Sequence, residues 1–197
     1  MDKEYLVQQL SDLAEKYDIP AGKEVLGELV AMSSFRVIPK GSLIASIGDD
    51  TRYGGLMLNG TARSYYVDSD GNDITRGFAV EGVLFMDEGF YGYDERICMW
   101  EALEDSTVML CETSKVRKLI RENAEFKDLW ITILEMSVRY KLYRENGFLV
   151  ENATERYLHF RKLYPDLISR VPQKHIATYL GITPESLSRI RNSLKDQ

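Results

Sequence analysis

Histidine and cysteine are scarce in this sequence, which excludes several classes of metal and redox site. The two histidines, His159 and His175, both follow residue 150, so residues 1–150 offer no imidazole ligand. The two cysteines, Cys98 and Cys111, are too few for a disulfide framework or a four-cysteine iron–sulfur cluster, and their 13-residue separation fits no zinc motif. We therefore predict two buried, reduced thiols, no metal site and no cofactor.

Acidic pairs occur without a partner histidine, which argues against catalysis. Asp49-Asp50, Asp87-Glu88 and Asp94-Glu95 lie in predicted turns, whereas both histidines lie in predicted helices outside the strand-rich region. Acid–base and nucleophilic catalysis need such groups within hydrogen-bonding reach of each other. We therefore expect that the protein is not an enzyme.

The chain also lacks a long apolar run, and no stretch is long enough to cross a bilayer. Its first residues, MDKEYLVQQLSDLAEKYDI, are charged throughout and lack the basic and apolar regions of a secretory signal. We expect a cytoplasmic protein with no membrane partner.

Acidic residues outnumber basic ones overall but not near the C-terminus. The 197 residues carry 31 acids and 25 bases, a net charge of −6. Residues 1–150 hold 26 acids and 17 bases, whereas residues 151–197 hold 5 acids and 8 bases. Because charge acts over a Debye length of roughly 8 to 10 Å, this basic segment is suited to phosphate although the whole chain is acidic.

Hydrophobic periodicity separates a helical start from a strand-rich region. Apolar residues at helical spacing predict helices in the first thirty residues, and short β-branched and aromatic runs from Phe35 to Cys111 predict a small antiparallel barrel or sandwich. Asn59-Gly60 predicts a two-residue hairpin with a primed turn. The run DSDGND at 68–73 predicts a second hairpin turn, because its oxygen spacing does not fit a calcium-binding EF-hand loop.

After Cys111 the pattern becomes helical, and one long helix with two apolar rows is predicted over residues 125–151. The first row, a heptad seam, is Leu129, Ile133, Met136, Tyr140, Tyr143, Gly147 and Val150. The second row is Ile131, Leu134, Val138, Leu142 and Leu149. We expect one row to pack on the barrel and the other on a second copy, and we assign the dimer interface to the first row, at Leu129, Ile133, Met136, Tyr140 and Tyr143. The alternative is that both rows are core of a single chain.

The last part of the chain has the features of a helix-turn-helix. Gly181 permits the turn, Thr183 and Pro184 begin the second helix, and Ala177 leaves room where the two helices cross. Polar side chains that are able to hydrogen-bond base edges face outward, namely Glu185, Ser186, Ser188, Arg189 and Asn192. Positive charge comes from Arg170, Lys174, Arg189, Arg191 and Lys195. The alternative is an ordinary helical corner with a solvated polar face.

The segment RVPQKHIATYLGITPESLSRIRNSL at 170–194 resembles the DNA-binding helix pair of the Crp/Fnr superfamily of bacterial transcription regulators. The order of barrel, long helix and terminal module resembles the family over nearly the whole chain. The resemblance implies an α+β fold with an N-terminal double-stranded β-roll, jelly-roll-like and similar to a cyclic-nucleotide-binding domain. Its implied divisions are a β-roll effector or sensor domain with N-terminal helices at 1–124, a dimerisation helix at 125–151 and a helix-turn-helix DNA-binding domain at 152–197.

The same resemblance implies a sequence-specific transcription regulator that acts as a homodimer on double-stranded DNA with a palindromic operator, with RNA polymerase as a further partner. By position, Glu185 and Arg189 match base-contacting residues of the family. Ser188 shares their face, and the predicted phosphate contacts are Arg170, Gln173 and Lys174.

Two departures from the family pattern alter what we expect of DNA binding. Pro184 stands where many members have an arginine, so we expect one base contact fewer and a different operator. The family usually continues into a β-hairpin wing, whereas this sequence ends at Gln197. We therefore expect no wing or a truncated one, and weak binding that depends on dimerisation. The competing hypothesis is a ligand-sensing or protein-interaction β-roll that has lost efficient DNA binding, which a gel shift would distinguish.

In family members that bind cyclic AMP, a Gly-Glu pair followed by Arg-Ser-Ala holds the ligand. The corresponding segment here is FMDEGFYGYDERICMWEALED at 85–105, in which Arg96 matches the phosphate arginine and Glu88 lies nearby. These two residues form the candidate effector pocket. An alternative interpretation of Arg96 is an ion pair with Asp94 or Glu95 on a solvated turn.

The rest of the cyclic-AMP pattern is absent. Phe85-Met86 occupies the Gly-Glu position, Ile97-Cys98 replaces the Ser-Ala, and Lys141-Leu142 stands about where the central helix would offer hydroxyls to adenine. We therefore expect regulation that is independent of cyclic AMP, and the sequence identifies no other small-molecule effector.

Overall fold

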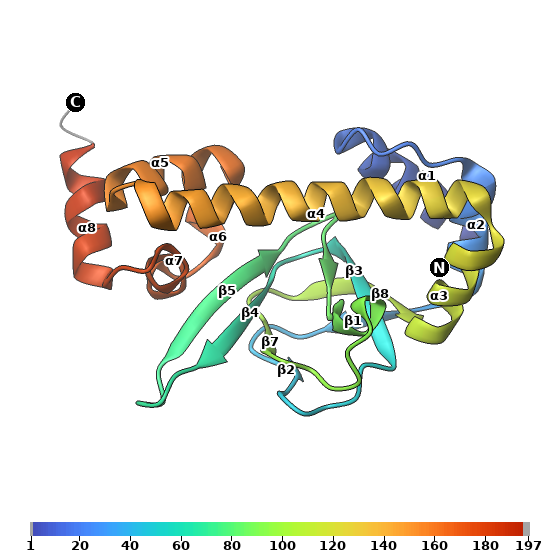
Figure 1. The fold of residues 1–197 in the computed structure, drawn as a ribbon, viewed down its shortest axis with the longest axis horizontal. Helices are drawn as coiled ribbons and strands as arrows, with labels where there is room; N and C mark the ends of the chain where they lie inside the picture. The colour runs from blue at the N-terminus through green and yellow to red at the C-terminus, as the bar shows by residue number, and fades with distance from the viewer. Residues whose placement is uncertain (1, 195–197) are drawn as a thin grey trace. The chain divides into compact units, whose positions relative to one another are not determined.

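The computed structural model describes residues 2–194, and their contacts form two compact units. Within the described residues, the N-terminal unit comprises residues 2–63 and 78–137, and the C-terminal unit comprises residues 64–77 and 138–194. The elements, labelled in Figure 1, are α1 Lys3–Lys16, α2 Lys23–Ala31, β1 Ser33–Ile38, β2 Leu43–Ala45, β3 Tyr53–Asn59, β4 Ala62–Val67, β5 Asp73–Ala79, β6 Leu84–Phe85, the 3-10 turn η1 Glu88–Tyr91, β7 Met99–Ala102, β8 Ser106–Glu112, α3 Thr113–Glu122, α4 Ala124–Val150, α5 Ala153–Leu163, α6 Leu167–Arg170, α7 Gln173–Leu180 and α8 Pro184–Ser193. Three of these elements, β4, β5 and α4, contribute residues to both units.

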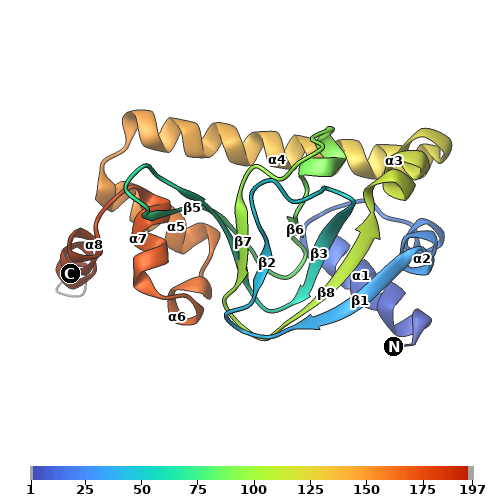
Figure 2. The same cartoon turned by 90° about the horizontal axis from the view of Figure 1, so that it is seen from below.

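The strands form two four-stranded sheets, which confirms the predicted β-roll. The first sheet has the order β1-β8-β3-β6 and the second the order β2-β7-β4-β5. Central strand β8 pairs antiparallel with β1 on one side and β3 on the other, with Ser33 opposite Cys111 and Gly55 opposite Leu110. Figure 2 shows β1, β8 and β3 side by side, with α1 and α2 next to them.

The alternating direction of side chains along β8 explains how one sheet contributes to two apolar clusters. Met109 and Cys111 belong to an apolar cluster with the N-terminal helices, whereas Val108 and Leu110 belong to a second cluster with Trp100 from the other sheet. Successive side chains of a strand point to opposite faces, so the two sets separate without any break in the strand. Both cysteines are free and buried, as predicted, and burial raises the pKa of the Cys111 thiol, which therefore stays protonated.

The hairpin predicted at Asn59-Gly60 is wrong, because β3 and β4 lie in different sheets. Gly60 has a φ of 101° but Asn59 does not have a positive φ, so the primed turn is not formed. The Gly60 N–H donates to the Glu81 carboxylate, and a side chain at Gly60 would meet Ser106 Oγ at 2.3 Å. Glycine is therefore required here for a tight crossing between sheets.

The second predicted turn is confirmed, since residues 68–72 join β4 to its neighbour β5. The Asp68 carboxylate accepts backbone N–H groups of Asp70 and Asn72 at 2.9 and 2.8 Å. These bonds, led by the one from Asn72, hold the pKa of Asp68 below its usual value. The carboxylate is used to close the turn, as aspartate commonly does.

The C-terminal unit is built on helices α5 to α8, which follow α4. Its α5 begins with a capping box, in which the Asn152 side chain accepts from the N–H of Glu155 and the Glu155 carboxylate accepts from the N–H of Asn152. Tyr157 and Phe160 of α5 and Leu167 of α6 are 4%, 2% and 1% exposed and form the core beneath the last two helices. Among the helices of residues 2–194, none is long and apolar enough to cross a membrane.

Candidate functional site

The last two helices form the predicted helix-turn-helix. Helix α7 ends at Gly181, which has a φ of 69°, a conformation that favours glycine. Helix α8 begins at Pro184, and the Thr183 hydroxyl caps it by accepting from the Ser186 N–H at 3.2 Å. A side chain at position 181 would also lie 3.0 Å from the Phe148 ring. The turn therefore depends on glycine for both conformation and space.

Buried apolar contacts fix α8 against α7. Ile176, Ala177, Leu180 and Leu187 are 1%, 0%, 3% and 0% exposed. Ala177 is small enough to let the two helices approach closely. Burying each larger side chain contributes about 1.5 to 3 kcal/mol, so the pair is a rigid support for its outer face.

That outer face carries both charges and hydroxyls. Glu185, Ser188, Arg189 and Asn192 are exposed on α8, and Ser186 is half-buried and accepts from Arg189 Nη2 at 3.3 Å. The backbone N–H of Glu185, with smaller contributions from Thr183 and Arg189, holds the pKa of Glu185 below its usual value. At neutral pH the face therefore presents an ionised acceptor beside a guanidinium donor.

The predicted phosphate contacts lie at the start of α7. Gln173 and Lys174 are exposed in its first turn, and Arg170 is half-buried in the last turn of α6. The N-terminus of a helix favours anions through its N–H groups and dipole. Lys195, which also contributes to the predicted positive charge, lies outside the described residues.

In the N-terminal unit, the candidate effector residues lie in the segment between β6 and β7. The Arg96 N–H donates to the Asp49 carbonyl at 2.8 Å, and the Gly48 N–H donates to the Arg96 carbonyl at 3.0 Å. The Thr51 hydroxyl donates to the Tyr93 carbonyl at 2.6 Å. These bonds hold the segment against residues 46–53 and turn the Arg96 side chain inward.

Arg96 and Glu88 form an ion pair in the core. Arg96 Nη1 donates to Glu88 Oε2 and to the Met86 carbonyl, both at 3.0 Å, and Nη2 donates to the Tyr53 carbonyl. The Cys98 thiol donates to the other Glu88 oxygen at 3.1 Å. Arg96 is 4% exposed and Glu88 1%. The guanidinium charge is thus compensated within the chain.

The alternative interpretation of Arg96, an ion pair with Asp94 or Glu95 on a solvated turn, is wrong. Its carboxylate partner is Glu88, eight residues away, at 3.0 Å. Asp94 and Glu95 are exposed, whereas the Arg96 side chain is buried. A buried guanidinium needs a buried counter-charge, and Glu88 in the short turn η1 supplies it.

The assignment of the dimer interface to the first apolar row of α4 stays a prediction, although Leu129, Ile133 and Tyr140 make contacts within their own chain. Leu129 is 6% exposed and belongs to the apolar cluster that the first sheet forms with the N-terminal helices. Ile133 packs against the same cluster. The Tyr140 hydroxyl lies 2.9 Å from the Tyr179 hydroxyl. Of the other predicted interface residues, Met136 is half-buried and Tyr143 is 43% exposed with its ring 5.4 Å from that of His159.

Four of the five residues of the second row of α4 are exposed, and Leu134 is half-buried. Val138, Leu142 and Leu149 are 54%, 59% and 77% exposed, and Ile131 is 43% exposed. In the first row, Tyr143 and Val150 are exposed as well, at 43% and 76%. The helix has two apolar rows as predicted, but which row is more exposed to solvent depends on where the core of the chain lies. The spacing of residues within the helix does not contain that information.

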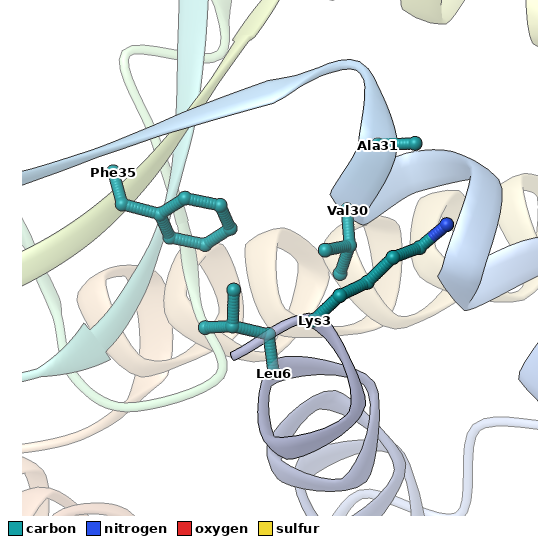
Figure 3. Close-up of a pocket in the computed structure, with 5 residues that line it drawn as sticks. All are labelled: Lys3, Leu6, Val30, Ala31 and Phe35. Carbon is teal, nitrogen blue, oxygen red and sulfur yellow. The ribbon is translucent and has the colours of Figure 1, made fainter. Parts of the chain in front are cut away.

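An apolar cleft occurs in the N-terminal unit, between α1, the end of α2 and β1 (Figure 3). It has a volume of about 420 Å³ and is lined by Lys3, Leu6, Val30, Ala31 and Phe35. None of the predicted site residues lines it. In residues 2–194, no group of three or more histidine, cysteine, aspartate or glutamate side chains is placed to hold a metal ion.

Comparisons with known proteins identify the fold. No protein-family model matches the chain, and no curated protein matches it in sequence. FixK2 from Bradyrhizobium japonicum is 22% identical, with 84% of this chain and 85% of that chain covered and a TM-score of 0.71. The c-di-GMP-responsive global regulator CLP of Xanthomonas campestris is 12% identical, with 84% of this chain and 88% of that chain covered and a TM-score of 0.64. The catabolite activator protein of Thermus thermophilus is 21% identical, with 89% of this chain and 84% of that chain covered and a TM-score of 0.56. The resemblance to Crp/Fnr regulators is confirmed at the level of the fold.

Proposed function

We propose that this protein is a sequence-specific DNA-binding transcription regulator of the Crp/Fnr type, that it acts as a homodimer and that it does not require cyclic AMP. The observation that carries the proposal is the outer face of α8. Its acceptor is the ionised carboxylate of Glu185, and the Arg189 guanidinium is exposed beside it as a donor. In the major groove, arginine pairs with guanine and glutamate accepts from cytosine. The face is therefore suited to reading base edges.

The second apolar row of α4 supports the dimeric part of the proposal. Val138, Leu142 and Leu149 are exposed on a helix of 27 residues, and apolar side chains in such a row are normally covered by a partner. A two-fold dimer through this row would present two copies of α8. Recognition helices of such dimers read half-sites about 34 Å apart, one turn of B-DNA.

The buried ion pair supports independence from cyclic AMP. A bound cyclic phosphate needs a compensating charge, and the Arg96 guanidinium already donates to Glu88 and to two backbone carbonyls. Releasing Arg96 would leave the Glu88 carboxylate buried without its counter-charge. That cost opposes any gain from the phosphate.

The experiment that tests DNA binding is selection of bound fragments from genomic DNA by the purified protein. A palindromic motif with half-sites one helical turn apart is expected. Failure to enrich any sequence over input DNA at low salt would overturn the proposed function.

Two alanine variants are expected to separate base reading from phosphate contact. Arg189→Ala should cost about 1 to 3 kcal/mol at each half-site and relax the preference at one base pair. Lys174→Ala should weaken selected and scrambled sequences equally and reduce the slope of affinity against salt. Titrations of both variants on both DNAs at several salt concentrations measure this. Equal behaviour of the two variants would reject the assignment of α8 as the reading helix.

Cyclic nucleotides are expected to leave the stability of the protein unchanged. Cyclic AMP or cyclic GMP at 1 mM should not shift the melting temperature, whereas a ligand at 100 times its Kd would add about 2.7 kcal/mol. Thermal scans with and without nucleotide measure this, and 1 mM ATP controls for non-specific anion effects. Saturable binding near 10 μM by calorimetry would contradict the prediction.

A further inference from the structure

Within the C-terminal unit, strand β5 of the β4–β5 hairpin contacts the first helix of the helix-turn-helix. The Thr75 N–H donates to the Thr178 hydroxyl at 3.3 Å, and the two threonine hydroxyls lie 2.9 Å apart. Thr75 belongs to β5 and Thr178 to α7, 103 residues later. The hairpin and the helix pair are therefore joined by side-chain contacts as well as by the chain.

Arg144 of α4 also connects the β4–β5 hairpin to α7. Its Nη1 donates to the Arg76 carbonyl of β5, and its Nη2 donates to the Tyr179 carbonyl of α7 at 3.3 Å. The guanidinium carbon also lies 4.1 Å from the centre of the Tyr179 ring. One side chain thus holds backbone groups of both the hairpin and α7.

Arginine is suited to this junction and lysine is not. A planar guanidinium directs several N–H groups at once and stacks on an aromatic ring, whereas an ammonium is a compact charge on a flexible stem. Burial raises the pKa of Tyr179, so its hydroxyl stays protonated for the contact with the Tyr140 hydroxyl.

We propose that Arg144 is a positioning residue that couples the β4–β5 hairpin to the α7–α8 pair, so that the hairpin fixes the orientation of the reading helix. The inference rests on the proposed function for its effect on DNA. A change in the position of α7 should move α8 as well, because the two helices are in contact and Leu180 of α7 and Leu187 of α8 are both buried.

Arg156 provides a matched control. Its Nε donates to the Leu180 carbonyl at the end of α7 at 3.0 Å, and its Nη1 donates to the Glu151 carbonyl. It therefore also binds the backbone of α7, but within residues 2–194 these hydrogen bonds do not reach the hairpin. Loss of Arg156 should loosen α7 alone.

Hydrogen exchange tests the coupling without DNA. Arg144→Met should speed exchange at least tenfold in both 73–79 and 173–180, and Arg144→Lys should not rescue it. Arg156→Met should speed exchange in 173–180 only. Unchanged exchange in either segment of Arg144→Met, or rescue by lysine, would overturn the coupling.

DNA titration tests the consequence. Arg144→Met and Thr75→Val should each weaken binding to the selected operator at least tenfold while the mass of the assembly stays that of the wild type. Wild-type affinity in both variants would overturn the positioning role. If the wild-type protein itself selects no DNA, the proposed function fails and the exchange result alone decides the coupling.

Discussion

Replacing Glu88 by alanine is expected to lower the free energy of unfolding by about 3 to 5 kcal/mol, because it leaves a buried guanidinium without its counter-charge. Arg96 is 4% exposed and its other acceptors are the carbonyls of Met86 and Tyr53, which carry no net charge. The Cys98 thiol would also lose its acceptor. Urea unfolding followed by circular dichroism measures the change.

A surface ion pair provides the control for this variant. Asp50 and Arg52 lie 4.0 Å apart with side chains 69% and 68% exposed, so Asp50→Asn should cost no more than about 1 kcal/mol. A cost below about 1 kcal/mol for Glu88→Ala would show that Arg96 finds water or another carboxylate. The buried ion pair would then not be a fixed part of the core.

A double variant separates the charge from the hydrogen bonds. Glu88→Leu with Arg96→Met removes both charges, and replacing a buried pair by apolar residues is often neutral. The Met86 and Tyr53 carbonyls would lose a donor, and each unpaired buried group costs about 1 to 3 kcal/mol. We therefore expect the double variant to recover only part of the lost stability.

Local signals in the sequence predicted the helix-turn-helix well. Gly181, Thr183 and Pro184 act within one turn of their own positions, and the conformations they favour are the ones found. The hairpin turn at 68–72 is equally local, since Asp68 closes it with bonds to residues two and four positions away.

Features set by distant residues were not predicted. Asn59-Gly60 has a good hairpin sequence, but Gly60 bonds to Glu81 and packs on Ser106, so the chain crosses between sheets. Arg96 pairs with Glu88 and not with its neighbours in sequence. Arg144 had no predicted role, and the available signal was a basic residue among the aromatic residues of α4.

The second large effect is expected from the second apolar row of α4, where Leu142→Asp should convert a dimer into a monomer. Leu142 is 59% exposed, so a carboxylate there is solvated in the single chain but would be buried in a dimer through this row. Light scattering should report about twice the 22.7 kDa chain mass for the wild type and the chain mass for the variant. Because two linked reading helices bind more tightly than one, operator affinity should fall about 100- to 10 000-fold.

Two further variants decide which row forms the dimer. Gln8→Asp adds the same charge at an exposed position of another helix, α1, and should leave the mass unchanged. Ile133→Asp should lower the melting temperature, because Ile133 is half-buried against the core of its own unit and a carboxylate there would be partly desolvated. If Leu142→Asp remained a dimer at tens of micromolar, the second row would not be the interface, and the affinity of the variant for DNA would then equal that of the wild type.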